Sequence, residues 1–590
     1  MRLWLFLLGF VLVAPSSVRS DDHQEETVAV SPGIFHGDPP VAPTIGFFLD
    51  DWQPKSFITP VSQEASASSA TADAASAAPA TGHLPDGRSP AVTDTITVDA
   101  TAVITRIPPS AFGHNANTWM TAMITEPVFM THMTHLHPHI IRWPAGSGSD
   151  AYFWNCGPGD LPADAPAEVR DKSGAPRKAR YFFGKTTGAR SASLDDYYMM
   201  LQETGNEGLF TVNYGYARYG TSADPVATAA HLAADWVRYD HGRTRYWEIG
   251  NENFGDWEYG YRIDTTTNRD GQPPILTGSL YARHFKIFAD SMRKAAAELG
   301  VTLYIGAVTA ESPGFWGETS TRRNWNADMM KELNDKADFY VVHSYFTPYN
   351  KNSNAAEILY DATTVPGRVM QYVTQSLTAN GAAIKPIAMD EWNMFATGRE
   401  QQVSNISGVF AVIVMGEALS NRFGLAARWD LLNGWAGGND HGLFSAGDEP
   451  GIARWTPRPS FYYLYFLQKM RGDRLVKASV QGDTSLRAYA STFTSGELNV
   501  AIANVSATAR TAIIDMRHFA AGHRYYWYVL QGGDDNGEFS RRVFVNGHGP
   551  TAAAGGPDDY AVIPAWSAAT DKGVFITVPA YGAVILTIDK

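Results

Sequence analysis

The 590-residue chain contains a single cysteine, Cys156, so no disulfide can form within it. Its stability must therefore come from a packed core. Hydrophobic residues make up 44% of the chain, which is enough to build two or three domains with large cores. Cys156 lies in a Gly/Pro-rich stretch with no obvious histidine partner, and we expect no nucleophilic role for it.

Positive charge is scarce. The chain carries 47 Lys and Arg against 60 Asp and Glu, a formal net charge of −13, and it has no long basic run. This composition argues against nucleic acid and against an anionic membrane surface as partners. A neutral polysaccharide or oligosaccharide stays compatible with it, because binding such a ligand needs no charge steering. The 16 Trp can stack on sugar rings, although most aromatic side chains are expected to fill the core.

Long apolar runs are also missing beyond the N-terminus. Leu3–Ala14 follows Arg2 and ends at Pro15, which predicts a secretory signal with cleavage after Ser20. This run is shorter than the ~20 residues that a membrane span requires. The sequence therefore predicts a secreted protein, extracellular or periplasmic, without a membrane anchor.

Composition predicts five segments. They are a signal peptide (1–20), an N-terminal segment (21–60), a flexible linker (61–90), a barrel with a preceding strand (91–474) and a β-sandwich (475–590). The linker prediction rests on a composition of almost only Ala, Ser, Thr, Pro and Gly. The N-terminal segment has aromatic residues at Phe47, Phe48 and Trp52, and it is either disordered or docked through them.

Apolar strands alternate with helical patterns in the central part of the chain. A helix from Leu194 begins behind Ser193 as N-cap and ends at Gly205, and further helices are expected at 225–237 and 280–299. Such alternation predicts a parallel sheet with helices outside. The candidate strands lie near 108–114, 139–144, 208–214, 245–251, 301–308, 338–344, 386–390 and 425–432. Eight strands fit a (β/α)8 TIM barrel; an open doubly wound sheet is the alternative, but no Gly-rich phosphate loop follows a strand.

The pattern changes from about residue 475. Apolar and polar positions alternate around Leu498–Ile502 and Val574–Val578, and turn residues separate these runs. This pattern predicts a C-terminal antiparallel β-sandwich. A strand expected at 94–105 is a candidate to join it.

Two glutamates stand at the ends of separate strands. Glu252 follows the strand over 245–251, and Glu391 ends the short apolar run that begins at Pro386. Retaining glycoside hydrolysis needs two such acids, one proton donor and one nucleophile. We predict Glu252 as the acid/base, with a pKa raised to ~6–7, and Asn251 as a partner of a sugar 2-OH. The alternatives are a surface glutamate at 252 and a structural ion pair at 391.

Strand alternation bears on the choice of nucleophile. It points Asp390 and Glu391 to opposite sides, so only one of them is expected to face the barrel mouth. The longer side chain at the strand tip favours Glu391, although spacing alone leaves both open.

These segments together resemble the α-L-arabinofuranosidases of glycoside hydrolase family 51, members of a clan of (β/α)8 retaining glycosidases. The motifs that carry the resemblance are Arg-Trp-Pro-Ala-Gly-Ser (142–147), Val-Asn-Tyr-Gly (212–215), Trp-Glu-Ile-Gly-Asn-Glu (247–252), His-Ser-Tyr (343–345) and Asp-Glu-Trp-Asn (390–393). The resemblance spans roughly 107–435. Ser147 stands where the family has Asn, and the segment Gly113–Asn117 lacks the Glu that follows the family's Gly-His.

The resemblance implies roles for individual residues. Glu252 corresponds to the acid/base and Glu391 to the nucleophile, which Arg142 holds ionised. His343 and Tyr345 line the sugar site, and Tyr345 hydrogen-bonds the nucleophile. The predicted substrate-binding residues are Asn251, Arg142, Asn213, His343, Tyr345, Trp392, Trp435 and His441. The last two belong to a Gly-rich loop that we expect to form one wall of the substrate cleft.

No cofactor and no metal are predicted. Four histidines, His132, His135, His137 and His139, could bind a metal, but no Asp, Glu or Cys completes a site nearby. The predicted function is a secreted retaining glycosidase of plant-type polysaccharide with α-L-arabinofuranosidase-like activity. An endo-β-glycanase of the cellulase or xylanase type is the first alternative, and a non-catalytic carbohydrate-binding barrel is the second. The sugar, the linkage and the oligomeric state stay open.

Overall fold

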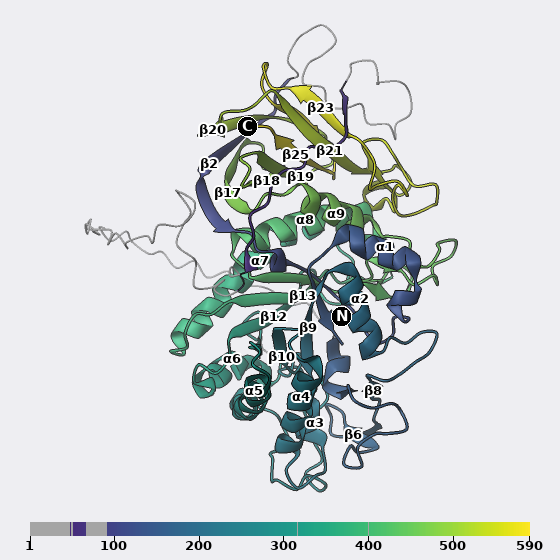
Figure 1. Ribbon diagram of the computed structural model, residues 1–590, viewed down its shortest axis with the longest axis vertical. Coiled ribbons are helices and arrows are strands. Elements are labelled where there is room, and N and C mark those ends of the chain that lie inside the picture. The colour runs from purple at the N-terminus through teal and green to yellow at the C-terminus, as the bar shows by residue number, and fades with distance from the viewer. Residues whose placement is uncertain (1–47, 49–50, 66–90, 145, 315–316, 399) are drawn as a thin grey trace, which may run out of the picture.

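The computed structural model describes residues 48, 51–65, 91–144, 146–314, 317–398 and 400–590. Its lower part in Figure 1 is a closed parallel barrel, and its upper part is a large sheet that folds over its own core. The eight barrel strands are β3 (Phe112–Asn115), β4 (Ile140–Trp143), β9 (Glu207–Val212), β10 (Tyr246–Ile249), β11 (Tyr304–Thr309), β12 (Phe339–Tyr345), β13 (Ile387–Asn393) and β14 (Leu425–Arg428). The predicted TIM barrel with a C-terminal sandwich is thereby confirmed.

Helices surround the barrel, and their ends follow the expected capping chemistry. Ser193 caps α2 in a capping box with Asp196, and Gly205 ends the helix at φ 68°, a conformation that glycine adopts easily. The helices are α1 (Pro127–Leu136), α2 (Leu194–Thr204), α3 (Gly215–Tyr219), α4 (Pro225–Asp240), α5 (Gly278–Leu299), α6 (Ser320–Leu333), α7 (Ala355–Ala379), α8 (Asn405–Ser420) and α9 (Pro459–Met470). Of these, α8 and α9 lie between barrel and sandwich (Figure 1), and their apolar residues belong to the main core.

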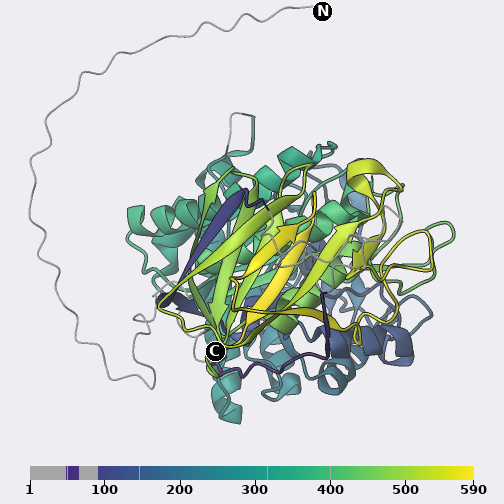
Figure 2. The ribbon, with the colours of Figure 1, turned by 90° about the horizontal axis from the view of Figure 1, so that it is seen from above.

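The C-terminal sheet contains eleven strands. They are β1 (Ser62–Glu64), β2 (Asp94–Arg106), β17 (Arg474–Gly482), β18 (Leu486–Thr492), β19 (Leu498–Asn504), β20 (Arg510–Arg517), β21 (Arg524–Gly532), β22 (Val543–Val545), β23 (Ala565–Ala569), β24 (Phe575–Val578) and β25 (Ala583–Ile588). Seen from above in Figure 2, β2 lies beside the C-terminal strands. The described pairs among the C-terminal strands are antiparallel, as predicted, and the two parallel pairs involve strands from the N-terminal part. Because β1 and β2 come from the N-terminal part, no hairpin fixes their direction, and they run parallel to β23 and β20.

The N-terminal segment is docked where the structure describes it. Phe48 is fully buried at the N-terminal ends of the barrel strands, with its ring 5.3 Å from Tyr246 and 5.8 Å from Phe339. Asp51 accepts hydrogen bonds from Arg245. Of the two alternatives for 21–60, docking through aromatic residues therefore holds for the described part.

The predicted flexible linker needs a correction at its start. Residues 62–64, expected to be linker, form β1 at the edge of the sandwich, because their backbone pairs with β23. The signal peptide (1–20) and the rest of the linker (66–90) lie outside the described residues.

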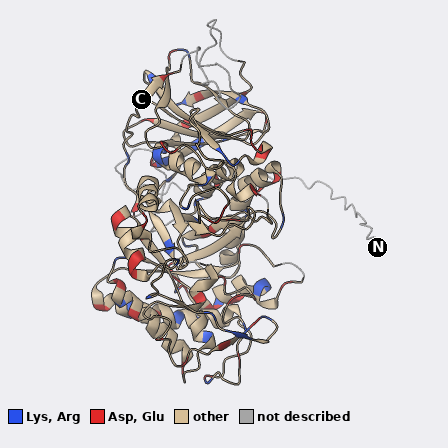
Figure 3. Ribbon diagram, turned by 90° about the vertical axis from the view of Figure 1, so that its right-hand side faces the viewer, with Lys and Arg blue, Asp and Glu red and all other residues tan. Residues whose placement is uncertain are grey.

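Charged positions of both signs are interspersed over the two domains (Figure 3). In the part of the chain that the structure describes, we find no helix with the length and apolar character of a membrane span.

Candidate active site

The two predicted glutamates meet at the C-terminal end of the barrel. Glu252 follows β10 and Glu391 belongs to β13, with β11 and β12 between them in the barrel. One carboxylate oxygen of each lies within 4.8 Å of the other and of a ring nitrogen of His343. The side chains are 17% and 7% exposed, so water reaches both only in part. Glu252 has φ 44°, an unusual backbone conformation for a non-glycine residue that is common at functional sites.

Arg142 holds this end of the barrel together. Its guanidinium is fully buried and donates to Glu391 Oε2 at 3.1 Å, to Asn251 Oδ1 at 2.9 Å and to Glu248 Oε1 at 2.5 Å. These contacts join β4, β10 and β13. Since Arg142 occupies the amide oxygen of Asn251, the orientation of the Asn251 side chain follows from that of Arg142.

Aromatic residues contact each glutamate. The Tyr345 hydroxyl donates to Glu391 Oε1 at 2.6 Å, and the Trp257 Nε1–H donates to Glu252 Oε2 at 3.1 Å. The ring of His441 lies 5.4 Å from that of Tyr345. Each of the four oxygens of the two carboxylates is thus held by a hydrogen-bond partner.

His343 bridges the two glutamates. Its Nδ1 lies 2.9 Å from Glu252 Oε1 and 3.5 Å from Glu391 Oε2, and its Nε2 lies 3.3 Å from Asp390 Oδ1. Because carboxylate oxygens face both ring nitrogens, both nitrogens need a proton, and the ring is an imidazolium. Burial opposes this charge, but Glu391, Asp390 and Glu252 outweigh it and hold the pKa of His343 well above its ordinary value.

The charge of His343 overturns the predicted order of proton affinities. Burial alone would raise the pKa of Glu252, but the hydrogen bond and charge of His343 outweigh it and lower that pKa. Burial raises the pKa of Glu391 in spite of His343, Arg142 and Tyr345. The raised pKa predicted for Glu252 is therefore wrong for this geometry. The physical reason is that His343 is hydrogen-bonded to Glu252 and is farther from Glu391.

Strand alternation also fails in β13. The register between β13 and β14 shifts between Met389 and Trp392, and that between β12 and β13 shifts between Val341 and His343. As a result Asp390 and Glu391 both reach the barrel interior, where each lies within 3.5 Å of Arg142 and of His343. The prediction that only one of these two carboxylates faces inward is wrong because an irregularity in a strand changes the side to which its residues point.

Three predicted substrate-binding residues have other partners. Asn213 donates to Tyr152 O and accepts from the backbone of Tyr216, which orients α3. Trp392 is buried against Phe410 of α8. Trp435 lies beneath the guanidiniums of Arg458 and Arg541, 5.5 and 5.0 Å from its ring centre. In the structure, these contacts are with the protein core or the sandwich domain, not with the two glutamates.

The four histidines that are close in the sequence do not share one set of partners in the structure. His132 and His135 both contact the hydroxyl of Tyr560, and His139 faces Glu207 at 3.9 Å. His132 and His135 thus pack α1 on the sandwich domain, whereas His139 lies beyond the end of this helix.

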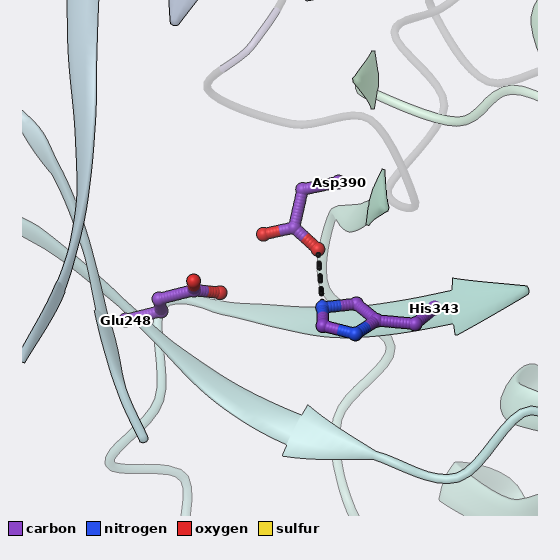
Figure 4. A group of neighbouring side chains, drawn as sticks. All are labelled: Glu248, His343 and Asp390. Carbon is purple, nitrogen blue, oxygen red and sulfur yellow. Dashed lines mark ion pairs between the residues drawn. The ribbon is translucent and has the colours of Figure 1, made fainter. Parts of the chain in front are cut away.

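Several residues of the site were not predicted from the sequence. Glu248 and Asp390 lie beside His343 (Figure 4), and Glu258 is buried and accepts hydrogen bonds from Ser147 and Asn251. A signal existed for Glu248, because it is the single acid in the otherwise apolar strand β10, and Asp390 was weighed only as the alternative to its neighbour Glu391. Such an acid in a barrel strand points to a polar interior.

Two groups of side chains have atoms close enough to hold a cation. They are Glu248, His343 and Asp390, and Glu252, His343 and Glu391, with the ligand atoms within 4.8 Å of one another in each group. The Arg142 guanidinium competes with a cation in the first group, because its Nε lies 2.5 Å from Glu248 and 3.5 Å from Asp390.

Comparisons with known proteins agree with this fold. No protein-family model matches the chain. An intracellular exo-α-(1→5)-L-arabinofuranosidase from Streptomyces lividans is 24% identical over 280 residues, which are 45% of this chain and 37% of that protein. The chain matches the GH51 α-L-arabinofuranosidase of Thermotoga petrophila with TM-score 0.57, 18% identity and coverage of 84% of this chain and 100% of that one. A bifunctional glucanase-xylanase from a metagenome library matches with TM-score 0.55, 14% identity and coverage of 85% and 100%. The resemblance to the family 51 enzymes and their clan is confirmed at the level of the fold.

Proposed function

We propose that this protein is a retaining glycoside hydrolase that acts on plant-type polysaccharide, with α-L-arabinofuranosidase-like activity. The observation that carries the proposal is the separation of Glu252 and Glu391, whose nearest carboxylate oxygens come within 4.8 Å. Carboxyl groups ~5–5.5 Å apart suit retention, whereas inverting enzymes need ~6.5–9.5 Å to admit a water molecule. The similarity to arabinofuranosidases supports the choice of sugar.

The residues at the site account for double displacement. Glu391 in its ionised form attacks the anomeric carbon while Glu252 in its protonated form gives a proton to the departing oxygen, which breaks the glycosidic bond and leaves a glycosyl ester on Glu391. These forms are the reverse of the order that burial and His343 favour in the free site. Glu252 then takes a proton from water, whose oxygen attacks the same carbon and releases Glu391. Arg142 and Tyr345 fix the two oxygens of the nucleophile throughout.

A screen against aryl glycosides and plant polysaccharides tests the proposal. Hydrolysis of an aryl α-L-arabinofuranoside, with the sugar released in its original anomeric configuration, is expected. Inversion, or no hydrolysis of any glycoside, would reject it.

An endo-β-glycanase is the second candidate, and exposed aromatic residues favour it. Trp257, the hydrogen-bond partner of Glu252, is 51% exposed. Tyr349 is 71% exposed and packs on Phe395, which stacks on Tyr345. Aromatic faces on both flanks of the two glutamates can stack on further sugar units of a chain.

Substitution of these aromatic residues should separate the two candidates. If the enzyme binds several sugar units, Trp257→Ala and Tyr349→Ala should each raise KM for oligosaccharides about tenfold, or ~1.4 kcal/mol. Neither should change KM for a small aryl glycoside as strongly. Tyr360→Ala is the control, because Tyr360 is 63% exposed on α7. Equal effects on long and short substrates would favour the exo-acting candidate.

The pH profile should depend on His343. The imidazolium stabilises the ionised forms of Glu252 and Glu391, so His343→Ala should raise the pKa of both carboxyls. Both limbs of the profile of kcat/KM should then move to higher pH. A shift of either limb to lower pH would contradict a charged His343.

Secretion is part of the proposal and rests on the N-terminal sequence from Arg2 to Ser20. Expression of the full chain followed by N-terminal sequencing of the exported protein tests it. Mature protein that starts at Asp21 is expected, and retention of the full chain inside the cell would contradict it.

A further inference from the structure

A second pair of carboxyl groups, those of Glu248 and Asp390, lies beside His343 (Figure 4). Both side chains are 0% exposed. Glu248 Oε1 accepts from Arg142 and from the hydroxyl of Thr211. Glu248 Oε2 accepts no hydrogen bond from the described residues, whereas the two oxygens of Asp390 have ion-pair contacts, Oδ1 with His343 at 3.3 Å and Oδ2 with Arg142 at 3.5 Å. An acceptor atom without a donor is costly in a buried site, so Glu248 Oε2 is expected to carry a proton.

The charges of the site lead to the same expectation. Four carboxyl groups, those of Glu248, Asp390, Glu252 and Glu391, surround two cations, Arg142 and His343. Fully ionised, this cluster would carry two excess negative charges inside the barrel. Like charges at such short range cannot all ionise, and the least stabilised carboxyl retains its proton.

We propose that Glu248 is a neutral carboxylic acid whose O–H donates a hydrogen bond to Asp390 and thereby positions the charge of Asp390 next to His343. Glu248 is then a positioning residue, since it acts on Glu252 through Asp390 and His343. Asp390 is the ionised member because it lies 3.5 Å from Arg142 and 3.3 Å from His343, two cations. The oxygen of Glu248 that faces Arg142 is its Oε1, which leaves Oε2 to hold the proton.

The proton affinities of the two acids differ in the same sense. Burial raises the pKa of Glu248 to about 8, and the neighbouring Asp390 adds to this effect, while Arg142 opposes it. Burial opposes ionisation of Asp390 as well, but Arg142 and His343 outweigh it and hold its pKa below the ordinary value. The effect on Glu252 rests on the proposed function, whereas the proton on Glu248 can be tested without any substrate.

Infrared spectroscopy of the full chain tests the proton directly. The wild-type protein should show, near neutral pH, a C=O stretch of a protonated carboxyl that disappears in Glu248→Gln. Glu417→Gln is the control, because Glu417 is a half-buried glutamate on α8 that accepts a hydrogen bond from Tyr489. That variant should keep the band. Asp390→Asn is a second variant in which the band should shift, since Glu248 loses its charged acceptor.

Unfolding gives an independent measurement. A carboxyl with a folded-state pKa of about 8 and an unfolded value of 4.5 retains its proton in the folded protein between these pH values and releases it on unfolding. The stability it contributes is complete below pH 4.5 and is lost as the pH rises toward 8. In this window wild type should release one more proton on unfolding than Glu248→Gln.

Three results would overturn the proposal. They are an unchanged infrared spectrum in both Glu248→Gln and Asp390→Asn, equal proton release by wild type and Glu248→Gln, and loss of the wild-type band on addition of a divalent ion that binds the protein. If the infrared band behaves as expected but the wild type hydrolyses no glycoside, the protonation of Glu248 is supported and the proposed function is rejected. If the wild type is active, Glu248→Gln should keep most of the wild-type kcat. Glu248→Ala should lose more of it.

Discussion

Replacing Glu391 by alanine should lower kcat by ~10⁴-fold or more, which corresponds to about 5 kcal/mol of transition-state stabilisation. The carboxylate of Glu391 is the proposed nucleophile, so its removal abolishes both the formation and the hydrolysis of the glycosyl ester. Arg142 keeps Asn115 Oδ1 and Glu248 Oε1 as acceptors when Glu391 is lost. The variant should therefore fold, and steady-state kinetics on an aryl glycoside should measure chemistry alone.

Glu298→Ala is a suitable control for this experiment. Glu298 is 44% exposed and pairs with Arg238 on the outside of the barrel, and its removal should leave kcat unchanged. A loss of less than about tenfold in Glu391→Ala, with a folded protein, would mean that another group attacks the sugar. Asp390 would then be the first candidate, since it belongs to the same strand and lies in the same interior.

The barrel was predictable because its signals are local. Each strand is a short apolar run, and caps such as Ser193 and Gly205 mark the helix ends within a few residues. Since the carboxyl ends of the strands meet at one face of such a barrel, the meeting of Glu252 and Glu391 followed from the fold alone.

What the sequence could not supply depends on contacts between distant segments. Phe48 packs on Tyr246 and Phe339, which lie about two hundred residues away or more, and no local pattern distinguishes it from a disordered aromatic residue. The inward turn of Asp390 depends on register shifts with β12 and β14, which alternation along β13 cannot reveal.

Proton affinities were the least predictable property of the site. The type and spacing of Glu252 and Glu391 indicated two acids but not their order of ionisation. That order depends on a third residue, His343, whose two ring nitrogens both face carboxylates. A resemblance placed His343 near the sugar, but its contact with Glu252 is a property of the folded barrel.

Replacing Glu252 by alanine should have an effect that depends on the leaving group. If Glu252 is the acid/base, natural glycans need its proton and should lose ~10²–10⁴-fold in rate, the usual contribution of general acid catalysis. Activated aryl glycosides leave without a proton and should lose much less in the first step. The glycosyl ester on Glu391 should then accumulate as a burst, because water attacks it slowly without a base.

Added azide should rescue turnover of Glu252→Ala. A small anion can occupy the space left by the side chain next to Trp257 and attack the glycosyl ester without help from a base. The product should be a glycosyl azide with the anomeric configuration of the substrate, because two displacements at the same carbon restore it. If azide rescued Glu391→Ala and not Glu252→Ala, Glu252 would be the nucleophile and Glu391 the acid/base. An inverted azide from Glu252→Ala would exclude double displacement, because it requires a single attack on a sugar that was never bound to Glu391.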